Sequence, residues 1–129
     1  MKIYYVNGKP NEIAIKKVKN GEIIIIKDEG IISKKILESA YLKAKRSFNN
    51  NTSIGRDIGT EMMLYLATNR QISEALEKYG VKGEGKYFIV SENELDLKNL
   101  GFEEIEFKEL ENEELLKELE KIAMFELKK

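Results

Sequence analysis

The chain has 129 residues and a formal net charge of −1; 42% of its residues are hydrophobic and 35% are charged. This length and balance are typical of one folded domain, which we expect to span residues 1–129. The chain contains no cysteine and no histidine. Their absence excludes disulfides, thiolate zinc sites, thiol nucleophiles and imidazole bases. Most of the common catalytic machinery is therefore absent, and we expect no metal or cofactor.

The start of the chain does not have the pattern of a targeting segment. Residues 1–6 meet the turn formers at 7–10 before the apolar core of a signal peptide can develop. No later run approaches 18 apolar residues. These patterns predict a cytoplasmic protein.

The first third of the chain is expected to contain two strands and a long helix. Residues 3–6 predict a strand, and residues 12–18 fit either a short helix or an alternating strand. Four consecutive isoleucines at 23–26 lie between charged residues, which is typical of a strand buried on both faces. Ser33 is placed to cap a helix that runs to about residue 48, with apolar residues on one face and lysines elsewhere.

The middle of the chain predicts a pair of helices. Asparagines at 49–51 break the long helix, and Asp57 is placed to cap a second one that reaches about residue 68. Residues 62–67 are apolar on every side, so this helix should be surrounded by other elements. A short helix over 71–79 follows, with Gly80 suited to a left-handed C-terminal cap. The two helices should form a hairpin.

The last third predicts two more strands and a closing helix. Residues 87–90 have the pattern of a buried strand, and residues 104–107 that of a further strand after a short helical turn. The final helix has an apolar stripe from Leu115 to Leu127, and its remaining surface is expected to be solvated. The expected fold is α/β (α+β): a single domain with a mixed sheet of about four strands, packed with helices and a central helical hairpin.

Charge is distributed unevenly along the chain. Residues 1–60 carry 12 basic and 6 acidic side chains, whereas residues 61–129 carry 10 basic and 17 acidic ones. Such asymmetry points to nucleic acid, because binding of phosphates needs local positive potential rather than a high overall charge. Lysine-rich helix faces that are merely solvated explain the same pattern, and charge alone leaves both readings open.

Three arginines stand out against nineteen lysines. Arg46, Arg56 and Arg70 lie within 25 residues of one another, while the lysines are spread over the chain. Arginine suits a site where a planar fork of donors meets a phosphate, a carboxylate or a base. The alternative is that these arginines neutralise Asp57 or Glu61 within the helical layer, since an unpaired buried carboxylate is costly.

The glycines around Arg56 do not form a nucleotide-binding loop. Residues 53–60 precede a helix, but they lack the Gly-Lys-Ser/Thr sequence of the Walker A motif. A phosphodiester or a sugar beside Arg56 remains possible. Of the aromatic residues, Phe48 and Tyr65 are expected in the core, whereas Tyr41 and Tyr79 are left open between core packing and base stacking.

The same region carries a family resemblance. Residues 47–48, 53–67 and 70–80, including the run Ser-Ile-Gly-Arg-Asp-Ile-Gly-Thr-Glu at 53–61, resemble the kinase-binding small subunit of the KEOPS complex, the archaeal-type TPRKB-like proteins. The resemblance implies a non-catalytic subunit of a complex that makes threonylcarbamoyladenosine (t6A) in tRNA. It also implies two partners: the kinase-like ATPase subunit of KEOPS and the single-stranded 3′ CCA end of tRNA.

The resemblance and the residue pattern together suggest two sets of site residues. The tRNA-binding candidates are Lys45, Arg46, Asn49, Arg56 and Arg70. The partner-binding candidates are Ile72, Ala75, Leu76 and Tyr79. Two alternatives stay open: an adaptor without nucleic-acid contact, whose arginines would be interrupted by acidic groups from the C-terminal half, and a small enzyme that uses Asp57 or Glu61 as general base.

Overall fold

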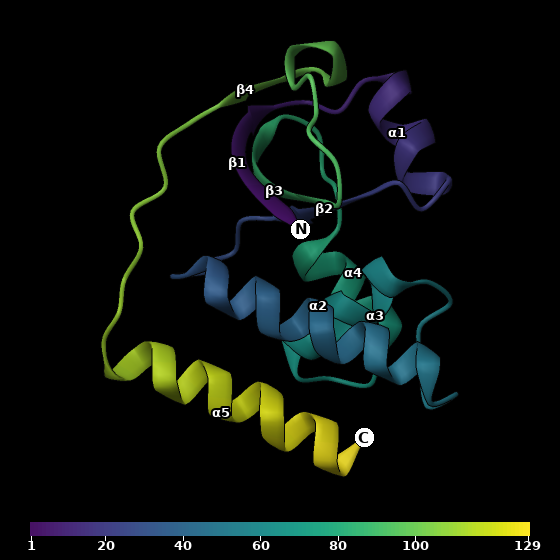
Figure 1. The fold of residues 1–129 in the computed structure, drawn as a ribbon, viewed down its shortest axis with the longest axis vertical. Coiled ribbons are helices and arrows are strands. Elements are labelled where there is room, and N and C mark those ends of the chain that lie inside the picture. Colours follow the sequence, from purple (N-terminus) through teal and green to yellow (C-terminus); the bar gives the residue numbers. More distant parts are fainter. The chain divides into compact units, whose positions relative to one another are not determined.

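The structure, a computed structural model, describes residues 1–129 and divides into two compact units. We call residues 1–29 with 80–107 the sheet unit, and residues 30–79 with 108–129 the helical unit. The expected combination of a four-stranded sheet with helices is confirmed (Figure 1). None of the helices is both long enough and apolar enough to span a lipid bilayer.

The sheet unit contains all the strands. They are β1 (Lys2–Gly8), β2 (Ile23–Lys27), β3 (Gly85–Ser91) and β4 (Phe102–Glu104), in the order β2-β3-β1-β4. All three pairings are antiparallel, where the sequence predicted a mixed sheet. Runs of β-branched residues show that a strand forms, but its direction depends on how the connections return the chain.

The structure decides two local predictions for the sheet unit. The ambiguous segment after the first turn is a helix, α1 (Glu12–Lys19), because the Asn11 side chain accepts from the backbone N–H of Ala14 at 3.0 Å. The strand predicted at 104–107 lies instead at 102–104, after the 3-10 helix Lys98–Leu100. Gly101, with φ of +95°, turns the chain directly into its pairing with β1.

The core of the sheet unit joins the sheet to α1 and the 3-10 helix. Its members are Val6, Ala14, Ile23, Ile25, Tyr87, Ile89, Leu100 and Phe102. The rings of Tyr87 and Phe102 meet edge to face, with centroids 6.0 Å apart. Burial of each large apolar side chain contributes about 2 kcal/mol, so this cluster contributes substantially to the stability of the unit.

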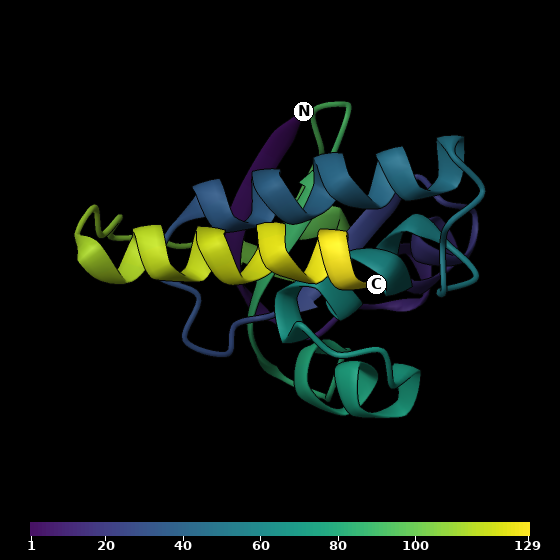
Figure 2. The ribbon, with the colours of Figure 1, turned by 90° about the horizontal axis from the view of Figure 1, so that it is seen from below.

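The helical unit contains four helices. They are α2 (Lys34–Asn49), α3 (Ile58–Ala67), α4 (Ile72–Tyr79) and α5 (Glu113–Lys128). Both predicted N-caps are confirmed: Ser33 accepts from Lys35 N–H at 3.0 Å, and Asp57 accepts from Thr60 N–H at 2.7 Å. Helices α2 and α5 lie side by side (Figure 2).

The predicted hairpin of α3 and α4 forms, but its caps differ from the prediction. The apolar helix α3 is buried over residues 61–66, as its sequence indicated. It ends at Thr68, which adopts the left-handed conformation at φ +49°. Gly80, predicted as a left-handed cap of α4, is not among the residues with positive φ, so that prediction is wrong. The left-handed residue lies instead at the end of the preceding helix, at Thr68, where the chain reverses between α3 and α4.

We predict that Gly101→Ala destabilises the protein much more than Gly21→Ala. Both glycines have positive φ, which costs a residue with a Cβ about 1 kcal/mol or more. A Cβ at Gly101 would also lie 2.3 Å from the carbonyl oxygen of Lys9, whereas nothing lies within 4 Å of one at Gly21. The additional loss for Gly101→Ala should be about 2 kcal/mol in urea unfolding, because backbone atoms must move. Equal losses would show that the close approach is not structurally important.

Candidate functional site

A buried carboxylate organises the region of the predicted site. Glu61, on the first turn of α3, is fully buried. Its Oε1 accepts from the backbone N–H of Ile54 at 2.9 Å and of Gly55 at 2.7 Å. Its Oε2 pairs with the ammonium of Lys129, which follows α5. Glu61 therefore ties the loop at 50–57 to the C-terminal residue.

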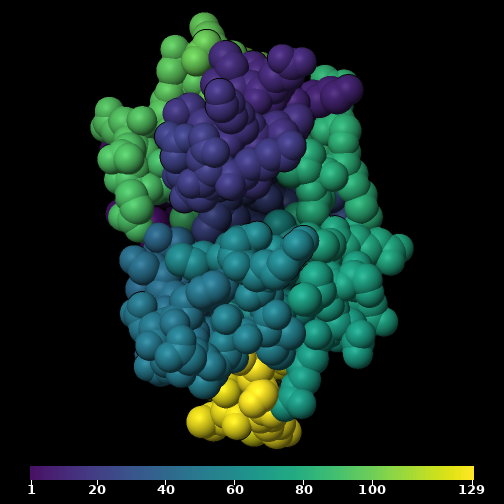
Figure 3. Space-filling model, turned by 90° about the vertical axis from the view of Figure 1, so that its right-hand side faces the viewer, coloured from purple at the N-terminus to yellow at the C-terminus, as the bar shows by residue number.

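The Lys129 ammonium is enclosed by polar partners. Its side chain is only 5% exposed, and it also donates to the hydroxyls of Tyr65 and Ser47, which lie 2.8 Å from each other. Burial by itself would lower the pKa of Lys129, but hydrogen bonds to Glu61 and Tyr65 outweigh it and raise this pKa above its usual value. The amine therefore stays charged. Figure 3 shows the C-terminal end of the chain, in yellow, against the blue-to-teal segment that includes α2 and the loop after it.

The loop that Glu61 holds presents Arg56 to solvent. A Cβ at Gly55 would lie 2.8 Å from the backbone nitrogen of Glu61, so the loop packs closely on the start of α3. Thr52 N–H donates to Ser47 O at 2.9 Å and fixes the other end of the loop on α2. Arg56 itself is exposed and has neither an ion pair nor a hydrogen bond. Its guanidinium is therefore available for a ligand.

The alternative prediction that an arginine neutralises Glu61 is wrong, because the ion-pair partner of Glu61 is Lys129. Asp57 is likewise engaged, as the N-cap of α3. The same contacts count against the alternative of a small enzyme based on these carboxylates. Both oxygens of Glu61 accept from donors of the chain itself, and the side chain is fully buried, so it does not face a substrate.

The structure separates the five tRNA-binding candidates into two groups. Lys45 and Asn49 are exposed one turn apart near the end of α2, and the Lys45 ammonium lies 5.4 Å from the centre of the Tyr41 ring. Arg46 is instead held by Glu126 of α5, with Nε and Nη2 each 2.8 Å from a carboxylate oxygen. This hydrogen-bonded pairing raises the pKa of Arg46. Arg70 donates to the backbone carbonyl of Lys128. Lys45, Asn49 and Arg56 thus lack carboxylate partners.

The charge asymmetry of the sequence is largely lost in the fold. The helical unit carries 13 basic and 12 acidic side chains, and the sheet unit 9 and 11. The reason is that the acidic C-terminal segment returns to the basic helix α2, where Lys35 pairs with Glu111 at 2.5 Å and Arg46 with Glu126. Any basic surface is therefore confined to a small area, and the net charge of a chain segment does not predict its position.

Two of the four partner-binding candidates are core residues. Ala75 and Tyr79 are buried, and the Tyr79 hydroxyl donates to the carbonyl of Leu66 at 3.4 Å. Ile72 is half-buried, whereas Leu76 is exposed. Of these four residues, Leu76 and the exposed part of the Ile72 side chain can therefore contact a partner.

The aromatic rings of the helical unit mostly belong to its core. Tyr65 is buried as predicted, and its ring meets Phe125 edge to face at 5.3 Å. Phe48 is half-buried, so its predicted core position holds in part. Tyr41 and Tyr79, left open by the sequence, are also buried. Their faces are not exposed for base stacking.

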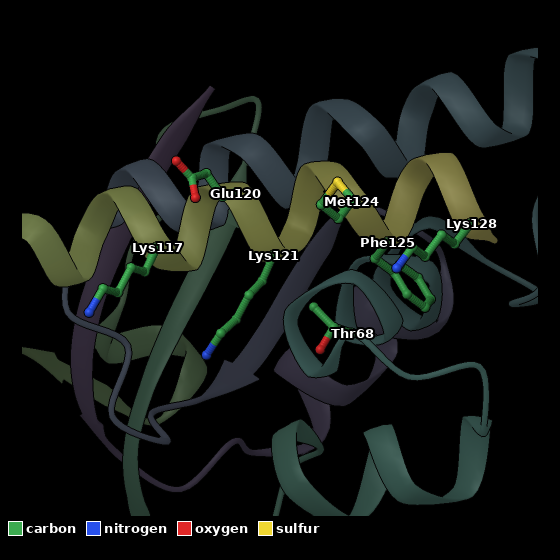
Figure 4. A pocket seen from close by; sticks show the side chains of 7 residues that line it. All are labelled: Thr68, Lys117, Glu120, Lys121, Met124, Phe125 and Lys128. Carbon is green, nitrogen blue, oxygen red and sulfur yellow. The ribbon is translucent and has the colours of Figure 1, made fainter.

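An open pocket beside α5 was missed by sequence reasoning. It has a volume of about 480 Å³ and is lined by Thr68, Lys117, Glu120, Lys121, Met124, Phe125 and Lys128 (Figure 4). Three lysines on one helix face, at intervals of four and seven residues, are the signal that could have found it. The sequence predicted that this surface, which is largely glutamate and lysine, is a solvated helix face.

We predict strong coupling between Glu61 and Lys129. Glu61→Gln and Lys129→Met should each cost about 3 kcal/mol, because each leaves an uncompensated buried charge. The double variant should cost at least 1 kcal/mol less than the sum of the singles, measured by urea unfolding. Because the pKa of Lys129 is raised, the pair's contribution should be complete below about pH 10 and be lost at higher pH as the amine deprotonates. Additive single losses would rule out the pair as the anchor.

The chain was compared with known proteins. A search of curated proteins finds no significant match. A scan of protein families matches residues 9–126 to the family described as kinase binding protein CGI-121. The match covers both units and includes α2 to α4, from which the resemblance was drawn. The chain therefore belongs to the kinase binding protein CGI-121 family.

Proposed function

We propose that this protein is the kinase-binding small subunit of an archaeal-type KEOPS complex in the cytoplasm. In this role it has no active site of its own. It docks on the kinase-like ATPase subunit and holds the 3′ CCA end of tRNA while the complex makes t6A. Membership of the kinase-binding family supports the protein partner. The observation that carries the tRNA proposal is Arg56, an exposed guanidinium without a partner on a loop that Glu61 fixes.

The geometry around Arg56 suits an unpaired RNA end. A guanidinium offers a rigid fork of donors that matches phosphate oxygens. Lys45 and Asn49 follow one exposed face of α2 toward the loop, and they add an ammonium and an amide. Because the loop is already ordered by Glu61, little conformational entropy has to be lost on binding. A single-stranded tail exposes both its backbone and its base edges to such groups.

An adaptor that binds the kinase without nucleic acid is the second candidate. The Arg46–Glu126 pair is the arrangement that this alternative predicts, since a carboxylate of the C-terminal half neutralises an arginine of the N-terminal half. The burial of Tyr41 and Tyr79 also removes two rings on which bases could have stacked. Arg56 and Lys45 distinguish the two functions, because an adaptor has no use for unpaired cations there.

The proposal is tested by a binding assay with two ligands. The purified protein should retain the purified kinase-like ATPase subunit, and it should retain full-length tRNA more tightly than the same tRNA trimmed of its CCA end. The trimmed tRNA is the matched control, since only the single-stranded tail differs. Retention of the kinase without retention of either tRNA would favour the adaptor, and equal affinity for both tRNAs would contradict the proposed role of the CCA end.

We predict that Arg56→Gln weakens tRNA binding more than Arg46→Gln. The two changes are chemically identical, but only Arg56 is free to meet a phosphate, whereas Arg46 is already satisfied by Glu126. In fluorescence titrations at several salt concentrations, Arg56→Gln should lower affinity several-fold and reduce the slope of log K against log salt by about 0.7. An equal or larger effect of Arg46→Gln would remove Arg56 from the proposed surface.

A further inference from the structure

Helix α5 has two apolar faces, of which the fold of the helical unit uses one. Leu115, Ile122 and Phe125 are buried on the inner side. A second set lies on the outside, with exposed fractions of 62% for Leu116, 49% for Met124 and 80% for Leu127. Ala123 is exposed between them. We call Leu116, Ala123, Met124 and Leu127 the outer face of α5.

The outer face continues onto the neighbouring helix. Leu42 of α2 is 60% exposed and lies one turn before Arg46, which holds Glu126 on α5. Figure 2 shows α2 and α5 running alongside each other. Scattered exposed leucines need no explanation, but aliphatic side chains gathered on two adjacent helices form a patch typical of a protein interface.

A row of lysines borders this apolar patch. Lys117, Lys121 and Lys128 line the pocket beside α5, and Met124 and Phe125 form its apolar part. Figure 4 shows Lys117 and Lys121 extending from the same side of the helix. Lys117 and Lys128 have no ion pair, and Lys121 meets only its helix neighbour Glu118, at 3.3 Å. Lys117 and Lys128 therefore present positive charge that no ion pair neutralises, although Glu120 also lines the pocket.

We infer that the outer face of α5, with its lysine row, is the surface that docks the kinase partner. This inference rests on the proposed function, which supplies that partner. The partner surface that fits is an apolar ridge bordered by carboxylates, with one apolar side chain seated in the pocket between Met124 and the lysines. Leu76, the exposed candidate on α4, has only the half-buried Ile72 as an accessible apolar neighbour on its helix.

The chemistry of the patch favours a protein over RNA. Bases stack on exposed aromatic planes, but the aromatic ring of the pocket, Phe125, is 9% exposed and is packed against Tyr65. The exposed groups are aliphatic or thioether side chains, which pack against apolar protein surface. The lysines then act as a rim that orients the partner.

The test measures affinity for the purified kinase-like ATPase subunit by calorimetry. The double variant Leu116→Ser with Leu127→Ser should bind at least tenfold more weakly, because apolar anchors are lost. Its thermal unfolding should not change, since both side chains are solvated. The matched control is Ile15→Ser with Val18→Ser on α1, where the exposures are 44% and 39%. The control should bind like the wild type.

A charge-reversal pair tests the lysine row. Lys117→Glu with Lys121→Glu should weaken kinase binding several-fold at low salt and reduce its salt dependence, whereas Lys16→Glu with Lys19→Glu on α1 should not. Unchanged kinase affinity of the leucine double variant would overturn the inference, as would a larger loss from Leu76→Ser. Loss of tRNA binding instead of kinase binding in the lysine variant would assign the face to RNA and overturn it too. A wild-type protein that does not bind the kinase at all would refute the proposed function itself.

Discussion

The buried pair of Glu61 and Lys129 is the interaction on which the helical unit depends. It removes two charges from water, which is costly unless every remaining donor and acceptor is satisfied. Here two backbone amides, two hydroxyls and the opposite charge meet that condition. The pair joins the loop at 50–57 and the adjoining start of α3 to the residue after α5, which lies 68 positions beyond Glu61 in the chain. The presentation of Arg56 follows from this constraint.

Helix α5 has a larger role than its ordinary composition indicates. It covers part of the core with Leu115, Ile122 and Phe125, and it neutralises Arg46 through Glu126. Its C-terminal end positions Lys129 for the buried pair and supplies the carbonyl that accepts from Arg70. Residues of α5 accept hydrogen bonds from Arg46 and Arg70 and make none with Arg56. The helix thus determines which cations of the helical unit remain available to a ligand.

The two proposed contacts use different parts of one unit. The proposed tRNA surface lies at the end of α2 and on the loop after it, and the proposed kinase surface lies on the outer face of α5. Both are formed by residues 30–79 and 108–129, which are one compact unit. Because the two surfaces share α2 only through Leu42 and the Arg46–Glu126 pair, separate variants can weaken one contact and leave the other intact.

The sequence by itself determined the elements that depend on local chemistry. The caps at Ser33 and Asp57, the isoleucine strand, the apolar helix α3 and the family resemblance all follow from residues that are neighbours along the chain. Tertiary structure alone decided the antiparallel directions of the strands, the pairing of Glu61 with a residue 68 positions away and the neutralisation of Arg46. It also buried Ala75 and Tyr79 and exposed Leu127, which an amphipathic pattern cannot distinguish. The physical reason is that charge pairing and burial depend on which distant surfaces the fold brings into contact, and periodicity along one helix carries no information about its neighbours.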